Sequence, residues 1–192
     1  MNLDDVSDIF ENFDERIAHE EIINSQYMVS YPILLEAAQN LMSSMGANAV
    51  VPIARIAYGW MPTILKRYNP DQKELIRVFE AKEVGSFCEA KACVTGFNTS
   101  PINNSIVGLS KVLHFINPHY FPIWDSRVAK HFGIKNQSVN SVKKYHDYLD
   151  IINVLNKYDS TEMLQKLVSK ELNFEITKTR SSELILFSTR KN

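Results

Sequence analysis

A lysine and an aspartate in the middle of the chain have the residue types and spacing for covalent chemistry. Lys111 follows Gly108 at the start of an apolar stretch that we expect to be a regular helix from about Ser110. A lysine in the first helical turn faces the positive end of the helix dipole. That field would lower the pKa of its amine toward the reactive, neutral form. We therefore expect Lys111 to be a nucleophile, with Asp125 as its partner.

A second helix is expected directly after Asp125. This carboxylate should cap a helix over 126–132, and the glycine that follows should end it. The four residues before Asp125, Phe-Pro-Ile-Trp, should be extended, because a residue that precedes proline avoids the helical region. A break at Asn117-Pro118 separates them from the apolar helix over 105–116. Antiparallel packing of the two helices would bring Lys111 and Asp125 to one cleft.

Candidate residues for binding a phosphate and a base lie nearby. A glycine-containing turn ahead of a helix presents backbone N–H groups to a phosphate, so Gly108 and Ser110 are candidate contacts. His114, one turn beyond Lys111, is a candidate general acid. Basic side chains that could bind the phosphate backbone are Arg127, Lys130, Lys135, Lys143 and Lys144. Aromatic side chains that could line a base pocket are Tyr58, Trp60, Tyr120, Phe121 and Trp124.

Each of these residues also has a purely structural interpretation. Lys111 can be a surface lysine and Asp125 a plain helix cap. A lone histidine such as His114 is more often a satisfied core or surface group than a catalyst. The aromatic residues can belong to the core, and scattered lysines can solvate a surface.

The stretch Ile106–Gly133 resembles part of the helix-hairpin-helix DNA glycosylase superfamily, in particular its 8-oxoguanine glycosylase-like branch. The sequence Val-Gly-Leu-Ser-Lys that ends at Lys111 is similar to the end of the hairpin. The sequence Pro-Ile-Trp-Asp-Ser-Arg-Val-Ala-Lys that ends at Lys130 is similar to the following segment, with Trp124 as one extra residue. The resemblance implies an all-α domain with a helix-hairpin-helix core, whose hairpin-like segment would span residues 96–135.

The same resemblance implies an activity. It implies a DNA glycosylase, with or without lyase activity, that flips a modified base out of double-stranded DNA. Lys111 would attack C1′ of the nucleotide, and Asp125 would activate the amine or stabilise the sugar cation. The choice of base, of DNA or RNA, and of genome repair or phage defence stays open. An alternative is a noncatalytic nucleic-acid- or protein-binding domain that uses the basic face over 111–144.

Composition and charge set the broader class. Hydrophobic residues make up 45% and charged residues 22%, which is typical of a globular chain. No apolar run approaches the roughly 18 residues of a membrane span, and the acidic N-terminus does not resemble a signal peptide. We expect a cytoplasmic protein that does not bind membranes. Cys88 and Cys93 have no second pair to complete a zinc site, and some relatives' four-cysteine iron–sulfur cluster is absent, so no metal or cofactor is expected.

Periodicity predicts one helical domain over 1–192. An acidic amphipathic helix is expected within residues 1–25, and it could contact a protein partner. Further helices are expected from Pro32 to Met45, over 49–68 with a kink at Pro62, from Leu75 to about Val84, around 145–155 and around 161–168 with Ser160 as cap. The last twenty residues are ambiguous. Residues 172–177 alternate like a minor strand, and we favour a helix over 181–189.

Overall fold

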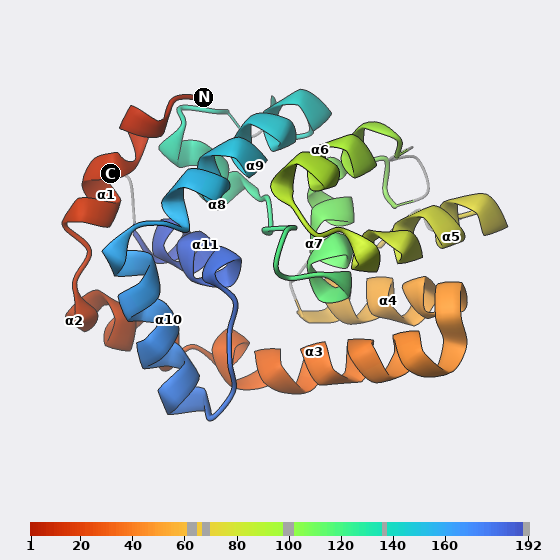
Figure 1. Ribbon diagram of the computed structural model, residues 1–192, viewed down its shortest axis with the longest axis horizontal. Helices are drawn as coiled ribbons and strands as arrows, with labels where there is room; N and C mark the ends of the chain where they lie inside the picture. The colour runs from red at the N-terminus through yellow and green to blue at the C-terminus, as the bar shows by residue number, and fades with distance from the viewer. Residues whose placement is uncertain (61–64, 67–69, 98–101, 136–137, 190–192) are drawn as a thin grey trace.

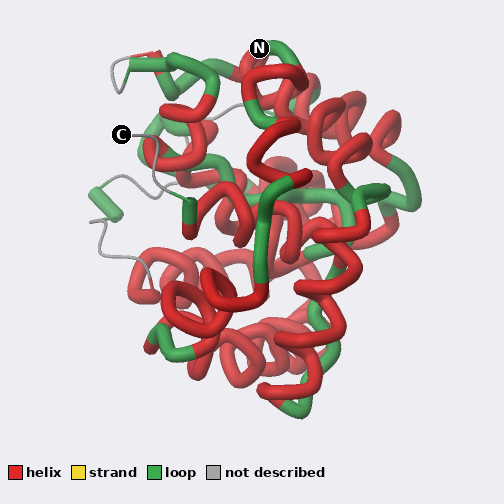
Figure 2. Tube along the Cα trace, turned by 90° about the vertical axis from the view of Figure 1, so that its left-hand side faces the viewer, coloured by secondary structure: helices red, strands yellow, loops and turns green. Residues whose placement is uncertain are grey.

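The computed structural model describes residues 1–60, 65–66, 70–97, 102–135 and 138–189, and its regular elements in these ranges are all helices (Figure 1; Figure 2). The first part of the chain forms η1 (Leu3–Asp5), α1 (Ser7–Glu11), α2 (Glu15–Ile17), the π-helix η2 (Ala18–Ile23), α3 (Gln26–Met45), η3 (Gly46–Ala49) and α4 (Val50–Trp60). The rest forms α5 (Gln72–Glu80), η4 (Ala81–Glu83), α6 (Phe87–Thr95), α7 (Ile106–Ile116), α8 (Ser126–His131), α9 (Val142–Leu155), α10 (Asp159–Leu172) and α11 (Lys178–Ser188). The all-α prediction is confirmed.

Helix α7 lies near the middle of the molecule, above α3 and α4 in the view of Figure 1. Apolar residues lie on all sides of this helix, with Ser110, Lys111 and His114 as its polar residues, and every residue except Val107 is buried. A helix that is apolar all round must be enclosed by other elements. Its position therefore fixes whatever side chains it carries, Lys111 among them.

Helix α11 is enclosed as well, although its sequence is polar. It packs against α1, η2, α8, α9 and α10. The polar residues Arg180, Ser181, Ser182 and Glu183 are all buried. Ser181 bonds within the helix, whereas Ser182 and Glu183 also bond to distant parts of the chain. Ser182 Oγ lies 3.1 Å from Thr161 Oγ1, for example. The helix expected over 181–189 is confirmed and begins earlier, at Lys178. The expected strand over 172–177 is wrong, because those residues end α10 and lead into α11.

The N-terminal acidic segment is not the continuous helix that its periodicity predicts. It is divided into η1, α1, α2 and η2. The side chain of Asn12 donates to Asp8 O at 2.8 Å, and Asp14 Oδ1 accepts from Arg16 N at 2.9 Å. Such local side-chain-to-backbone bonds compete with the helical ladder and restart the chain in a new direction.

Two other predicted helix starts are also wrong. Helix α3 begins at Gln26, because Ser25 caps it by accepting from Met28 N at 3.3 Å, so Pro32 lies in its second turn. Tyr158, not Ser160, occupies the capping position of α10. Pro62, the expected kink, lies outside the described residues.

A cluster of buried apolar side chains extends from Val6 to Leu186. Helices from both ends of the chain and from its middle contribute to this core. None of the helices in the described ranges is long and apolar enough to cross a membrane.

Candidate functional site

Gly108 lies inside α7 and not in a turn ahead of it, so the expected position of the helix start is wrong. Ser105 caps the helix, and its Oγ accepts from the Gly108 N–H at 3.3 Å. A Cβ on residue 108 would lie 1.8 Å from Tyr58 Oη. The glycine therefore permits α4 and α7 to approach closely. Its amide already has an acceptor, and this removes the reason to expect a phosphate contact there.

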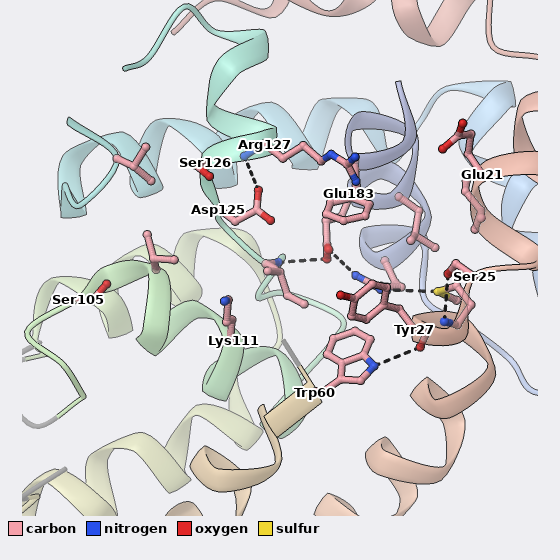
Figure 3. A pocket seen from close by; sticks show the side chains of 18 residues that line it. Glu21, Ser25, Tyr27, Trp60, Ser105, Lys111, Asp125, Ser126, Arg127 and Glu183 are labelled. Carbon is pink, nitrogen blue, oxygen red and sulfur yellow. Dashed lines mark hydrogen bonds and ion pairs between the residues drawn. The ribbon is translucent and has the colours of Figure 1, made fainter. Parts of the chain in front are cut away.

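Lys111 lies in the second turn of α7, with 5% of its surface exposed. Its side chain lines a cavity of about 530 Å3, and Asp125 lines the same cavity. Figure 3 shows the Lys111 amine pointing toward the Asp125 carboxylate. Burial lowers the pKa of the amine, and the charge of Asp125 partly offsets this fall. The two residues singled out by the sequence thus face one cavity.

Asp125 caps α8 as predicted. Its Oδ1 accepts from Arg127 N and Val128 N, each at 2.9 Å. The chain leaves α8 at Gly133 with a φ of +66°, which favours glycine. One carboxylate oxygen therefore holds the helix start, and the side chain still lines the cavity.

The extended segment Phe121–Trp124, which we call the strut, is held at every residue. Phe121 O accepts from His114 Nδ1 at 2.8 Å, and Pro122 O accepts from Tyr145 Oη at 3.0 Å. Ile123 N donates to Glu183 Oε2 at 3.1 Å. Trp124 N donates to Ser110 Oγ at 3.1 Å. These anchors come from α7, α9 and α11, so three helices jointly fix the position of Asp125.

His114 is one of these anchors and does not line the cavity that contains Lys111. Its Nδ1–H donates to Phe121 O, so Nε2 must accept from the Tyr31 hydroxyl, 2.9 Å away. Burial lowers the pKa of His114 to about 3, and the charge of Arg180 adds to this effect. His114 is therefore neutral, and both of its ring nitrogens form hydrogen bonds that position the strut. The general-acid role predicted from the sequence does not fit this arrangement.

Arg180 and Glu183 on α11 also line the cavity, and the sequence did not single them out. Arg180 donates to Glu183 Oε1, and its guanidinium lies 4.8 Å from the Tyr31 ring centroid and 5.4 Å from that of Trp60. Burial raises the pKa of Glu183 to about 7, because desolvation outweighs the opposing effects of Arg180 and the Ile123 N–H. In the sequence, an Arg–Glu pair one helical turn apart is typical of an exposed helix face. No local pattern distinguishes such an exposed pair from this buried one.

The five predicted aromatic residues are not brought together. Trp60 lines the cavity beside Lys111, and its Nε1 donates to Tyr27 O at 3.2 Å and to Ser30 Oγ at 3.1 Å. Tyr27 is a further aromatic wall that the sequence did not reveal. Tyr58 lines a neighbouring cavity, and Tyr120 packs on Phe87 elsewhere. Phe121 and Trp124 are buried in the core, where Trp124 Nε1 donates to Val139 O at 2.9 Å.

The predicted basic contacts also divide into groups. Arg127 is exposed, lines the cavity and lies over the Phe187 ring at 4.4 Å from its centroid. Ser110 is buried as an anchor of the strut. Lys144 donates to Ser138 O at 3.0 Å. The remaining predicted contacts are exposed and do not line the cavity; they are Lys130, Lys135 and Lys143.

A second cavity of about 570 Å3 adjoins the first, and both are lined by Ser105, Val107 and Lys111. Its other polar groups include Tyr58 and Asn103. On the opposite side of the first cavity, Glu21 and Ile22 of the π-helix η2 form part of the wall. The acidic N-terminal segment therefore contributes directly to the site. Short π-helical turns are frequent at functional sites.

The described ranges include both cysteine thiols and side chains of the types that can bind a metal. They contain no group of three or more His, Cys, Asp or Glu side chains arranged to hold a metal ion. Cys88 is exposed and Cys93 is half-buried, and both are free thiols.

These features define a helical protein whose cavity is lined by the Lys111 amine and by three carboxylates, those of Glu21, Asp125 and Glu183. No protein-family model matches the chain, and no curated protein or solved structure is significantly similar to it. The function must therefore be inferred from the cavity itself.

Proposed function

We propose that this protein is a DNA glycosylase with an accompanying lyase step, in which the Lys111 amine attacks C1′ of a modified nucleotide. The observation that carries the proposal is the pairing of Lys111 with Asp125 in one cavity. A buried amine with a lowered pKa has more of the neutral form that acts as a nucleophile. A neighbouring carboxylate can take a proton from the amine or stabilise a cationic sugar.

The shape and lining of the cavity support a flipped nucleotide as the ligand. Its volume of about 530 Å3 is within the range of small-molecule sites, roughly 300–1,000 Å3. The aromatic rings of Trp60 and Tyr27 offer faces on which a base can stack. Arg127, exposed and lining the same cavity, is suited to a backbone phosphate.

The test is covalent trapping. The protein is incubated with duplex oligonucleotides that each carry one modified base, among them 8-oxoguanine, uracil, hypoxanthine and 7-methylguanine, and borohydride is added to reduce an imine. We expect a stable protein–DNA adduct with at least one duplex. Lys111→Gln should abolish it, and the matched variant Lys170→Gln, which alters an exposed lysine of α10 that does not line the cavity, should retain it. Strand cleavage without an adduct, or equal effects of the two variants, would exclude Lys111 as the nucleophile.

A noncatalytic nucleic-acid-binding domain is the second candidate. It is favoured by the exposed lysines Lys130, Lys135 and Lys143, which do not line the cavity. Such a domain would bind duplex DNA with an affinity that falls steeply with salt. Lys111→Gln would then weaken binding no more than Lys130→Gln, and no base would be released from any duplex of the panel.

A further inference from the structure

We propose that Glu183 is the general acid that protonates the departing base, in the glycosylase reaction proposed above for Lys111 and Asp125. This inference rests on that proposed function. It starts from the two charges that develop when a glycosidic bond breaks: positive on the sugar and negative on the base. Lys111 and Asp125 address the sugar. A separate donor is then needed for the base.

The groups that line the cavity leave few candidates for this donor. An arginine cannot give up its proton in a protein, which excludes Arg127 and Arg180. Lys111 must be neutral in order to attack. His114 does not line the cavity, and its Nδ1–H already donates to Phe121 O. Glu21 and Tyr27 also line the cavity, but both are exposed to solvent. Among the carboxyl groups described at this wall, Glu183 is the buried one, and the enclosed helix α11 holds it rigidly.

The surroundings of Glu183 suit a proton donor. The titratable and charged groups that act on it are Arg180 on α11, Asp125 before α8, His114 on α7, Tyr31 on α3, and Tyr145 and Tyr148 on α9. Burial is the largest influence and raises the pKa of Glu183 to about 7, where a general acid is most effective at neutral pH. Two carboxyl groups in different environments commonly divide the roles of acid and electrostatic stabiliser.

The step balances as follows. The C1′–N bond breaks and its electron pair stays with the base, while the Glu183 O–H bond breaks and its proton goes to a nitrogen or carbonyl oxygen of the base. The lone pair of the neutral Lys111 amine forms the new bond to C1′. The products are the neutral free base, a secondary ammonium on C1′ and the Glu183 carboxylate, which Arg180 then neutralises. Transfer of a proton from this nitrogen to the sugar ring oxygen opens the ring and gives the iminium that borohydride reduces.

The experiment compares Glu183→Gln and Arg180→Gln with the wild type on whichever duplex of the panel is cleaved, under single-turnover conditions across pH 5–9. We expect the wild-type rate to fall above about pH 7, as Glu183 loses its proton. Glu183→Gln should lower the rate at neutral pH by roughly 100-fold or more and abolish this falling limb. Arg180→Gln removes a positive charge that lowers the pKa of Glu183, so it should move the limb to higher pH.

A cationic base provides an independent readout. 7-Methylguanine leaves as a neutral molecule without protonation, so its release should change by no more than a few-fold in Glu183→Gln. Because both variants disturb the same buried ion pair, a merely structural role would lower the rates for all bases alike and leave the pH limb in place. That result overturns the inference while the proposed function stands. Failure of the wild type to cleave any duplex or form any adduct overturns the proposed function, and this inference with it.

Discussion

Replacing Gly108 by alanine tests whether α4 and α7 are packed as closely as the structure indicates. The added Cβ would lie 1.8 Å from Tyr58 Oη and 2.9 Å from Tyr58 Cζ. Ordinary contact begins near 3.4 Å, so the hydroxyl would have to retreat by roughly 1.6 Å. Tyr58 is 5% exposed, so its hydroxyl can retreat only toward the neighbouring cavity that it lines. The phenol or the whole helix must therefore shift.

The size of the effect follows from two opposing contributions. Overpacking of a well-packed core costs about 1–3 kcal/mol, while glycine-to-alanine replacement inside a helix returns about 1 kcal/mol. We expect Gly108→Ala to lower the free energy of unfolding by up to about 2 kcal/mol, and the melting temperature by up to roughly 8 °C. Urea unfolding and calorimetry measure both quantities.

Gly59 supplies the matched control, because it is also helical but has open space where its Cβ would lie. Gly59→Ala should stabilise the protein by about 0.5–1 kcal/mol. Adding Tyr58→Phe to Gly108→Ala removes the nearest atom but leaves the 2.9 Å contact with the ring, so it should restore only part of the stability. Equal stabilisation by both alanine substitutions would refute the close approach of α4 and α7.

Three further predictions concern the site. The folded state lowers the pKa of His114 from 6.5 to about 3, which reduces the free energy of unfolding as pH falls below 6.5, and it raises the pKa of Glu183 from 4.5 to about 7, which offsets that loss down to about pH 4.5. Acid titrations of stability should therefore show a steep loss in the wild type only below about pH 4.5. In Glu183→Gln the loss should begin near pH 6.5, at up to about 1.4 kcal/mol per pH unit. Ser110→Ala leaves one buried strut N–H without its acceptor, so urea unfolding should show a loss of about 1–3 kcal/mol, whereas Ser110→Thr, which keeps the hydroxyl, should lose less. Arg127→Gln should weaken duplex binding and reduce the slope of log K against log salt by about one, while Lys170→Gln, an exposed lysine of α10, should leave the slope unchanged.

Local patterns in the sequence predicted much of the fold. The apolar run before Asn117, the Asp125 cap and the left-handed Gly133 each place an element boundary through interactions within a few residues. These boundaries were correctly predicted for that reason. The same local patterns predicted that Lys111 and Asp125 face one cavity, because only a short segment separates the two helices that carry them.

The remaining part of the site depends on tertiary contacts that no local pattern encodes. Arg180 and Glu183 are polar and one turn apart, so their sequence fits an exposed helix face as well as a buried one. Only the enclosure of α11 by five other elements, α1, η2, α8, α9 and α10, removes them from solvent. The prediction that Gly108 lies in a turn was wrong for a related reason. A glycine is required there because Tyr58, fifty residues earlier in the chain, leaves no space for a Cβ.

The anchoring of the strut has a consequence for the order in which the site can form. Ile123 is held by Glu183, sixty residues later in the chain, and the carbonyls of Pro118 and His119 accept from Thr177 and Thr179. During synthesis, a nascent chain that ends before α11 therefore contains Lys111 and Asp125 with the anchors from α7 and α9 but without the Glu183 anchor. The cavity is expected to close only when the last helix docks. Any activity would then require α11 to have docked, and long-range contacts of this kind also slow folding.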